Sequence, residues 1–364
     1  MSEFRKHDKY HRGEGLQPLA PLDLSQAPSL LALTEQMSRT AFGGRSLGEA
    51  VDVLYAMATD PRCFVVGTFS GAMTVAKQGL LLCDMIDQDI LNAVVSTGAL
   101  MAHGLVEAFG MTHFKYDGTQ DDATLFEQGY DRVYDTLELE QNLDDSEVII
   151  RDALADLDKS QTLCSSLLLR KIGKYLAEKF PDHRSILRSA YEKNVPVYIP
   201  AFTDSELGLD IALMSRREKL AGRPRLRYDP FLDLEDYTAH VCEQDALGIF
   251  TIGGGVPRNW AQQVGPYLDI MEKRIGLRIG KVQRFRYGVR ICPEPVHWGG
   301  LSGCTYSEGV SWGKFVPRHE GGRWSEVLSD ATIAWPLVLG AVLEKMKKEG
   351  TQARFEGPPP HREP

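Results

Sequence analysis

The octapeptide SEGVSWGK, residues 307–314, places a carboxylate, an indole and an amine within eight positions. Because an indole can exclude water from an ammonium group, Trp312 could lower the pKa of Lys314 and leave a neutral amine. Such an amine attacks imine or carbonyl carbons, and Glu308 could exchange protons or hold a substrate amine. A surface loop with a salt-bridged lysine also explains these residues, and elementary chemistry alone favours that simpler interpretation.

A run of three glycines is the second feature with chemical potential. Gly253, Gly254 and Gly255 follow an apolar segment and precede a helical pattern. Glycine lets the backbone approach a pyrophosphate, and the start of a helix favours its negative charge. Since the order is not GxGxxG, a tight turn needed only for chain geometry is an equal alternative. Asp204 and Asp330, which follow other apolar segments, could hold ribose hydroxyls or cap helices.

Short apolar segments alternate with amphipathic ones from Ser46 onward. This alternation predicts strands joined by helices, which is typical of a parallel sheet covered on both faces. We expect strands in 63–69, 92–96, 196–202, 247–252 and 282–292 (the last near the edge of the sheet), and one more just before Ser329.

Small or acidic residues follow these predicted strands. In doubly wound α/β proteins, ligands bind at the carboxyl ends of the strands. The candidate cofactor-binding residues are therefore Ser70, Gly71, Thr97, Gly98, Asp204, Gly253, Gly254, Gly255, Ser329 and Asp330.

Composition divides the chain into a body and two ends. Residues 1–40 are predicted to be an N-terminal extension with one short helix near 27–39, and 41–348 a single α/β domain. Within that domain, 119–160 is mostly acidic and helical in character. The Pro-rich end, 349–364, is predicted to be disordered.

Charge and residue usage exclude several classes of function. The net charge is −9 and basic residues form no stripe, so nucleic-acid binding is not expected. No apolar run is long enough for a membrane span, and the first residues lack the apolar core of a secretory signal. Six widely spaced cysteines without CxxC suggest reduced thiols in a cytoplasmic protein. Nine histidines without HExxH or a His–Cys cluster predict no metal site.

The segment SEGVSWGK closely resembles the active-site segment of deoxyhypusine synthases, in which this lysine becomes a covalent imine. Three further motifs of that family appear in the family's order: PAFTD at 200–204, GGGV at 253–256 and LSDATIAWPL at 328–337. Together they span about 43–345. The resemblance implies a doubly wound, mostly parallel α/β fold with helices on both faces.

The same resemblance implies an activity. In the family, NAD oxidises spermidine, and the 4-aminobutyl group passes to the lysine as an imine and then to an acceptor amine. The acceptor is a lysine of a translation factor, or free putrescine in related homospermidine synthases. Lys314 then corresponds to the nucleophile, Trp312 to the wall of the amine pocket and Glu308 to a pocket carboxylate. A homotetramer is also implied.

Some family positions differ, chiefly by loss of carboxylates. Ala102 and His103 stand where the family has paired acids after the second strand. Leu209 replaces its amine-binding aspartate, although Asp210 follows directly, and Asn259 replaces a pocket histidine. Two further aspartates are replaced by Trp298 and Leu301. Asp210 and Asn259 are therefore candidate substrate-binding residues. His103 is a candidate for proton transfer, although an ordinary helix residue explains it equally well.

Four functions follow as hypotheses. The first is an NAD-dependent transferase that moves an aminobutyl group from a polyamine through a Lys314 imine to an acceptor amine. The second is a homospermidine synthase with a free polyamine acceptor. The third is a catalytically idle NAD-binding paralogue with a role in assembly, and the fourth an unrelated Schiff-base enzyme.

Overall fold

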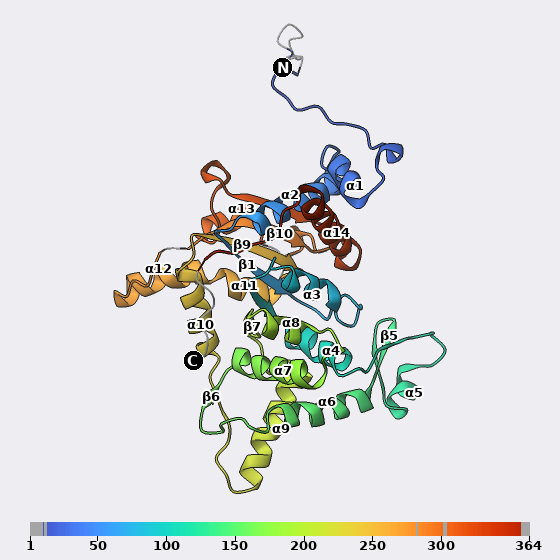
Figure 1. Ribbon diagram of the computed structural model, residues 1–364, viewed down its shortest axis with the longest axis vertical. Helices are drawn as coiled ribbons and strands as arrows, with labels where there is room; N and C mark the ends of the chain where they lie inside the picture. Colours follow the sequence, from blue (N-terminus) through green and yellow to red (C-terminus); the bar gives the residue numbers. More distant parts are fainter. Residues whose placement is uncertain (1–9, 11–12, 282, 301–303, 358–364) are drawn as a thin grey trace, which may run out of the picture.

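The computed structural model describes residues 10, 13–281, 283–300 and 304–357. Its centre is a parallel sheet in the order β11-β10-β9-β1-β2-β7 (Figure 1). The strands are β1 (Cys63–Phe69), β2 (Ala93–Ser96), β7 (Val197–Tyr198), β9 (Ala246–Ile252), β10 (Phe285–Ile291) and β11 (Arg323–Val327). The predicted strands are thus present, although the one expected in 196–202 is only two residues long, and β10 lies next to the edge strand β11.

Both faces of the central strands are buried. On β1, Val65 and Phe69 belong to one hydrophobic core, whereas Phe64 and Val66 belong to a second core on the opposite face. Successive side chains of a strand point to opposite faces, so a strand covered on both sides needs an unbroken apolar sequence. This requirement explains the run CFVVGTF.

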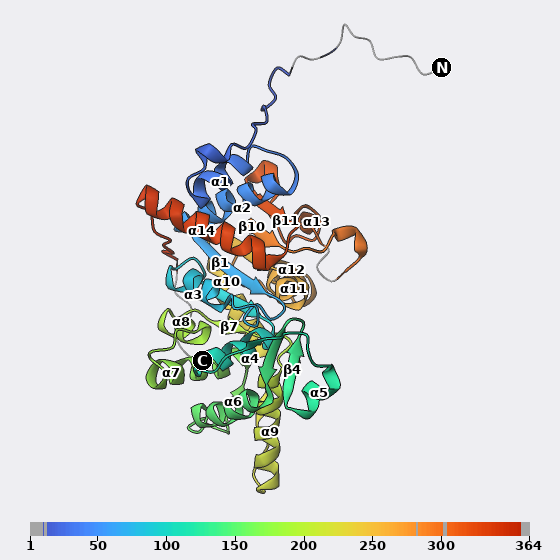
Figure 2. The same ribbon diagram turned by 90° about the vertical axis from the view of Figure 1, so that its right-hand side faces the viewer.

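Helices cover the sheet on two sides, as Figure 2 shows. One side carries α1 (Leu30–Met37), α2 (Phe42–Thr59), α3 (Gly79–Asp87) and α14 (Ala331–Glu349). The other carries α10 (Phe231–Cys242), α11 (Gly255–Gln262), α12 (Val264–Ile275) and α13 (Tyr306–Ser311). The predicted fold class, a doubly wound and mostly parallel α/β fold, is confirmed.

A second group of elements comes mainly from the part of the chain that connects β2 to β7. It forms the lower half of both views. Its helices are α4 (Gly98–Ala108), α5 (Asp122–Glu127), α6 (Glu140–Ala153), α7 (Ser165–Lys179), α8 (Ile186–Glu192) and, after β7, α9 (Glu206–Leu220). Its strands are β3 (Phe114–Lys115), β4 (Tyr130–Val133), β5 (Thr136–Leu139), β6 (Thr162–Leu163) and β8 (Arg227–Tyr228).

The prediction that 119–160 is helical is wrong over 130–139. There β4 and β5 form an antiparallel hairpin whose two-residue turn has Tyr134 at a positive φ of 54°. The strands are short and charged, and the turn lacks the Asn-Gly signal that marks such hairpins. Moreover, the buried residue of β5 is Glu138, so the usual pattern of apolar residues on the inner face is reversed.

The two ends of the chain also differ from the prediction. The expected short helix is α1, but it packs against α14: Leu31 is 4% exposed, and its backbone N–H donates to Glu344 Oε2 at 2.8 Å. After α14, the ring of Phe355 lies 5.5 Å from that of Phe64. Parts of 1–40 and of 349–364 therefore belong to the body, while 358–364 lies outside the described residues.

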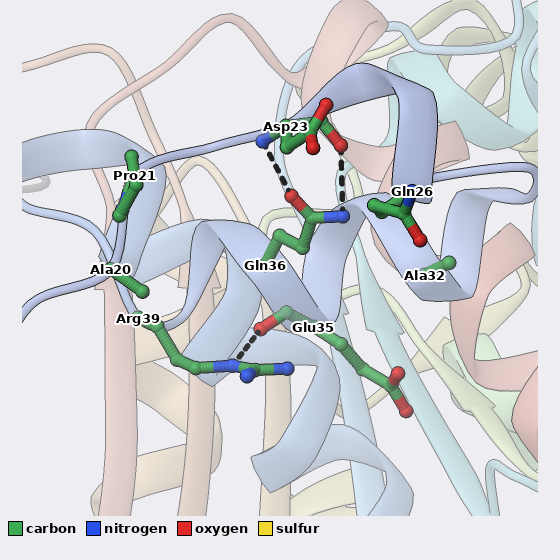
Figure 3. Close-up of a pocket in the computed structure, with 8 residues that line it drawn as sticks. All are labelled: Ala20, Pro21, Asp23, Gln26, Ala32, Glu35, Gln36 and Arg39. Carbon is green, nitrogen blue, oxygen red and sulfur yellow. Dashed lines mark hydrogen bonds between the residues drawn. The ribbon is translucent and has the colours of Figure 1, made fainter.

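A shallow hollow lies between the N-terminal segment and α1 (Figure 3). Gln36 spans it, since its side chain accepts from Asp23 N at 2.8 Å and donates to Asp23 O at 3.1 Å. None of the predicted site residues lines this hollow. None of the helices in the described ranges is long and apolar enough to cross a membrane.

Candidate active site

The segment that follows β1 connects several of the predicted strand ends. Ser70 Oγ accepts from Gly254 N at 3.0 Å, and Thr97 Oγ1 donates to Gly71 O at 2.8 Å. Further along, Gln78 Nε2 donates to the backbone O of Thr332, in the first turn of α14, at 2.7 Å. The parallel register aligns the carboxyl ends of the strands, so residues far apart in sequence meet there.

At two of these strand ends a glycine is required because a neighbouring serine side chain lies too close for a Cβ. A Cβ on Gly253 would lie 2.1 Å from Ser70 Oγ, and a Cβ on Gly98 would lie 2.2 Å from Ser205 Oγ. Gly253 also has a φ of +77°, which favours glycine. These two glycines satisfy chain geometry and by themselves say nothing about a ligand.

Gly71 and Gly255 are different, because the space beside them is open. Both have a positive φ, and no described atom lies within 4 Å of where a Cβ would be placed. Gly255 is the first residue of α11, where free backbone N–H groups and the helix dipole favour an anion. The open space beside these two stretches of backbone forms a cradle of the kind that a dinucleotide pyrophosphate requires, so the residues fit NAD.

The two strand-end aspartates have different surroundings. Asp204 is exposed, and the adjacent Ser205 caps α9 by accepting from Gly208 N at 3.3 Å. Helix capping therefore does not explain Asp204. Asp330 does cap a helix, since its carboxylate accepts from Thr332 N at 2.8 Å at the start of α14. Ser329 lies beside it, half-buried.

Lys314 lies between α13 and the sheet. Its backbone N–H donates to Gly309 O at 3.0 Å, and its carbonyl accepts from Phe285 N, at the start of β10, at 2.9 Å. The side chain extends to α11, where Nζ donates to Asn259 Oδ1 at 3.0 Å. Asn259 is four residues beyond Gly255, so α11 connects the glycine cradle to the lysine.

The surroundings of Lys314 favour its neutral form. The residue is 8% exposed, and burial lowers the pKa of its amine. The charge of Arg258 acts in the same direction, while Cys304 and Glu308 oppose it. The hydrogen-bond acceptor of Nζ is an amide oxygen without charge, and no described carboxylate forms an ion pair with it. The structure therefore does not support the interpretation of Lys314 as a salt-bridged surface lysine.

Trp312 and Glu308 are both exposed in the single chain. The Trp312 ring centre is 6.0 Å from Lys314 Nζ, but 64% of the residue is accessible. The indole thus covers Lys314 on one side, while its own outer face is in contact with solvent. Glu308 lies in α13, where its backbone N–H donates to Thr305 Oγ1 at 3.0 Å and its carboxylate is left in solvent.

Two buried arginines that the sequence analysis did not single out hold the segment before α13. Arg258 Nη2 donates to Cys304 O at 2.7 Å, and its guanidinium lies 5.1 Å from the centre of the Tyr306 ring. Arg290 Nε donates to Gly253 O at 3.1 Å. They tie the lysine-bearing segment to the glycine turn. An arginine inside the apolar strand β10 was the available signal, because a buried arginine requires partners.

Asp210 and His103 lie on other elements. Asp210 is buried on α9, where burial first and then the charges of Glu206 and Glu147 raise the pKa of its carboxyl to about 7. Both views place α9 well apart from α13. Within one chain, Lys314 contacts Asn259 and Trp312 and is influenced by the charge of Glu308, and no described contact joins it to Asp210. Leu301 lies outside the described residues.

His103, on α4, belongs to a separate polar cluster. Its Nδ1 is 3.4 Å from Glu138 Oε2, and His113 Nε2 approaches the same oxygen at 2.6 Å. Burial disfavours ionisation of Glu138, but its contacts with His103, His113 and Asn142 outweigh this effect and lower the pKa of the carboxyl to about 2. Sequence reasoning, which predicted no metal site, missed this cluster because its members are spread over 35 positions without a recognisable spacing.

The comparisons with known proteins show the family of this chain. The family model described as deoxyhypusine synthase matches residues 32–342. The chain belongs to the deoxyhypusine synthase family. The resemblance inferred from the motifs is thereby confirmed, and the match begins inside α1, in agreement with the packing of that helix on the body.

Curated relatives of this deoxyhypusine synthase family member cover most of its length. "Probable deoxyhypusine synthase 2" of Methanosarcina acetivorans is 34% identical over 329 residues, which is 90% of each chain. The "Deoxyhypusine synthase-like protein" of Chlorobaculum parvum is 32% identical over 330 residues, 90% of this chain and 89% of the relative.

Solved structures confirm the fold. The "putative deoxyhypusine synthase" of Entamoeba histolytica has a TM-score of 0.57 at 15% identity, over 93% of this chain and 99% of that one. The ternary complex of AgrE with ornithine and NAD+ has a TM-score of 0.50 at 11% identity, over 85% of this chain and 35% of that one. At these identities the likeness concerns the fold alone.

Proposed function

We propose that this family member is an NAD-dependent transferase that moves a 4-aminobutyl group from a spermidine-like polyamine through an imine on Lys314. The observation that carries the proposal is the environment of Lys314. Its amine is buried, its pKa is lowered, and its hydrogen-bond acceptor is the neutral amide of Asn259. Covalent amine catalysis needs this combination, because only the unprotonated amine is a nucleophile.

The proposed reaction at Lys314 consists of two successive transiminations, in which one amine replaces another on the same carbon. The neutral Nζ attacks the carbon of a substrate imine, and the departing amine leaves with a proton as the new C=N bond forms to Lys314. An acceptor amine then attacks the Lys314 imine and releases the lysine. In this proposal Glu308, which is exposed in α13, would exchange protons or hold the distal ammonium group of the substrate.

The cradle at Gly71 and Gly255 would hold NAD, with the exposed Asp204 available for a ribose hydroxyl. The chemistry that bound NAD supplies is reversible hydride transfer at an amine carbon, which forms the substrate imine and later reduces the product. Support for this assignment comes from the family.

The amine pocket would be completed by a second chain. Trp312 covers only one side of Lys314, and Asp210 and His103 lie on elements apart from it. A homotetramer whose active sites lie between subunits would enclose Trp312 and add groups from α4 and α9. The acceptor is then either a protein lysine, such as one on a translation factor, or a free polyamine.

The test is to incubate the protein with NAD and a panel of polyamines, with and without borohydride. Wild type should release diaminopropane from spermidine, and borohydride should trap an aminobutyl adduct on Lys314, located by peptide mass spectrometry. Lys314→Arg keeps the charge but cannot form an imine, so it should lower product formation at least about 1000-fold while NAD still binds. Lys281→Arg is the matched control, because Lys281 is exposed and paired with Asp245.

The products separate the alternatives. Homospermidine formed with putrescine would indicate a free polyamine acceptor, whereas transfer to a protein lysine would indicate a hypusine-type reaction. NAD binding without product or adduct, for every amine in the panel, would leave the idle paralogue as the better description. Full activity in Lys314→Arg would refute the imine mechanism.

A further inference from the structure

A second polar site lies away from Lys314, between α4 and the small sheet of β3, β4 and β5. His103 comes from α4, His113 from the residue just before β3, and Glu138 from β5. One ligand atom from each of the three side chains lies within 4.8 Å of the other two. Two imidazoles and one carboxylate in this arrangement are a common set of protein ligands for a transition metal.

Burial distinguishes this cluster from an ordinary surface group of polar residues. The side chains of His113 and Glu138 are 0% and 1% exposed, whereas that of His103 is 22% exposed. The cluster is therefore closed on the inside and reached by solvent on the His103 side. Such a layout holds an ion with three protein ligands and leaves a coordination position open.

The contact between His113 and Glu138 is not a well-formed hydrogen bond. His113 Nε2 is buried and only 2.6 Å from Glu138 Oε2, yet it has no hydrogen-bond partner in the described structure, because its N–H direction is not aligned with that oxygen. A buried ring nitrogen without an aligned acceptor is costly. A ring nitrogen of His103 lies within 4.8 Å of both atoms.

We propose that His103, His113 and Glu138 bind a divalent transition-metal ion, with Zn2+ as the first candidate. Imidazole ligands favour such ions over Mg2+ and Ca2+, which prefer oxygen ligands only. The ion would join α4 to the β4–β5 hairpin. The proposal is independent of aminobutyl transfer, because its test measures metal binding and not activity.

Neighbouring residues contact two of the proposed ligands, Glu138 and His113, and one of these contacts must change when an ion binds. Asn142 Nδ2 donates to Glu138 Oε1 at 2.8 Å and leaves Oε2 for the ion. Lys77 Nζ lies 3.1 Å from His113 Nδ1 and is also paired with Glu107. When an ion occupies Nε2, the proton of the neutral ring moves to Nδ1, so the contact with Lys77 is released while Glu107 keeps the ammonium group compensated.

The experiment uses full-length protein without an affinity tag, treated with a chelator and then titrated separately with Zn2+, Mg2+ and Ca2+ by calorimetry. The variants are His103→Gln, which changes a partly exposed side chain, and Glu138→Gln, which keeps the shape of the carboxylate. His319→Gln is the matched control, because His319 is 81% exposed and outside the cluster. Melting curves in chelator establish that each variant folds.

Wild type and His319→Gln should bind one Zn2+ per chain, and Mg2+ and Ca2+ should not compete. Both cluster variants should weaken binding by more than about 100-fold, beyond the 10–100-fold loss expected when only a supporting residue is removed. Co2+ should give the visible absorption bands of a four- or five-coordinate site in wild type and not in His103→Gln. The proposal is overturned if wild type takes up no Zn2+, if His103→Gln binds it equally well, or if Mg2+ or Ca2+ displaces it.

Discussion

Lys314 illustrates how neighbours without charge set up a reactive amine. A carboxylate at the position of Asn259 would stabilise the ammonium form, whereas the amide accepts a hydrogen bond from Nζ without that stabilisation. Burial then acts on the pKa with little opposition except from Cys304 and Glu308. The neutral hydrogen-bond acceptor at Asn259 is therefore consistent with a nucleophilic Lys314.

The glycine cradle gives a prediction at single-residue scale. Gly255→Ala should lower NAD affinity at least about tenfold, because the methyl group would enter the open space proposed for the pyrophosphate of the cofactor. Gly350→Ala is the control: Gly350 also has a positive φ and open space, so both variants bear a similar backbone cost of about 1–2 kcal/mol. Calorimetric titration with NAD measures the difference, and equal affinities in the two variants would contradict the site.

Asp210 gives a prediction of pH dependence. Its folded pKa of about 7 is above the unfolded value near 3.9, so its ionisation opposes folding increasingly as pH rises from about 4 through 7. Asp210→Asn should therefore raise the Tm at pH 8 and change it little at pH 4. Asp269→Asn, at an exposed aspartate on α12, is the control. A stabilisation that is equal at both pH values would show that the charge of Asp210 is not its cause.

At the scale of elements, α11 and α1 depend on residues outside their own segments. The first residues of α11 face the cofactor cradle, and Asn259 in its second turn holds Lys314, so one rigid helix couples the two halves of the site. By contrast, α1 owes its position to α14, since Leu31 is buried there and Glu344 accepts its backbone N–H.

The contact between α1 and α14 predicts that 1–40 is needed for full stability. Leu31→Ala should cost about 2–5 kcal/mol, because a buried leucine is lost from a packed interface. Leu24→Ala, at a residue that is 69% exposed, should change stability by less than about 0.5 kcal/mol. Urea unfolding measures both. If deletion of 1–40 leaves the Tm unchanged, the packing of α1 contributes nothing.

At the scale of the whole molecule, several apolar side chains are left in solvent where a second chain would cover them. Leu209 and Leu213, one turn apart on α9, are 53% and 48% exposed, and α9 projects from the body in both views. Trp312, beside the lysine, is exposed as well. Burial of such residues is the usual driving force for association, and it agrees with the proposed tetramer.

The oligomer is tested by light scattering at micromolar concentration. Wild type should have the mass of four chains, and the double variant Leu209→Glu/Leu213→Glu should have a smaller mass, because two charges would be buried at the interface. Leu80→Glu is the control, since Leu80 is equally exposed on α3. A monomeric wild type would exclude an active site shared between chains.

Much of the sheet could be predicted from the sequence, because each strand is marked by a contiguous run of residues. Strands buried on both faces must be continuously apolar, and the small residues at 70–71, 97–98 and 253–255 follow those strands directly. The hairpin at 130–139 could not be predicted in this way. Its strands are short, and its inner residue is a glutamate whose burial depends on two histidines from other elements.

By itself, the sequence determined the family, the parallel α/β fold and the lysine segment, since each is encoded by contiguous motifs. Only the tertiary structure decided which residues surround Lys314: Asn259 is 55 positions away, and burial depends on how α11, α13 and β10 pack. The same holds for the cluster of His103, His113 and Glu138, whose ligand atoms converge only when α4 and β5 fold together. Which distant residues come into contact depends on how the elements pack, and a local sequence pattern does not contain this information.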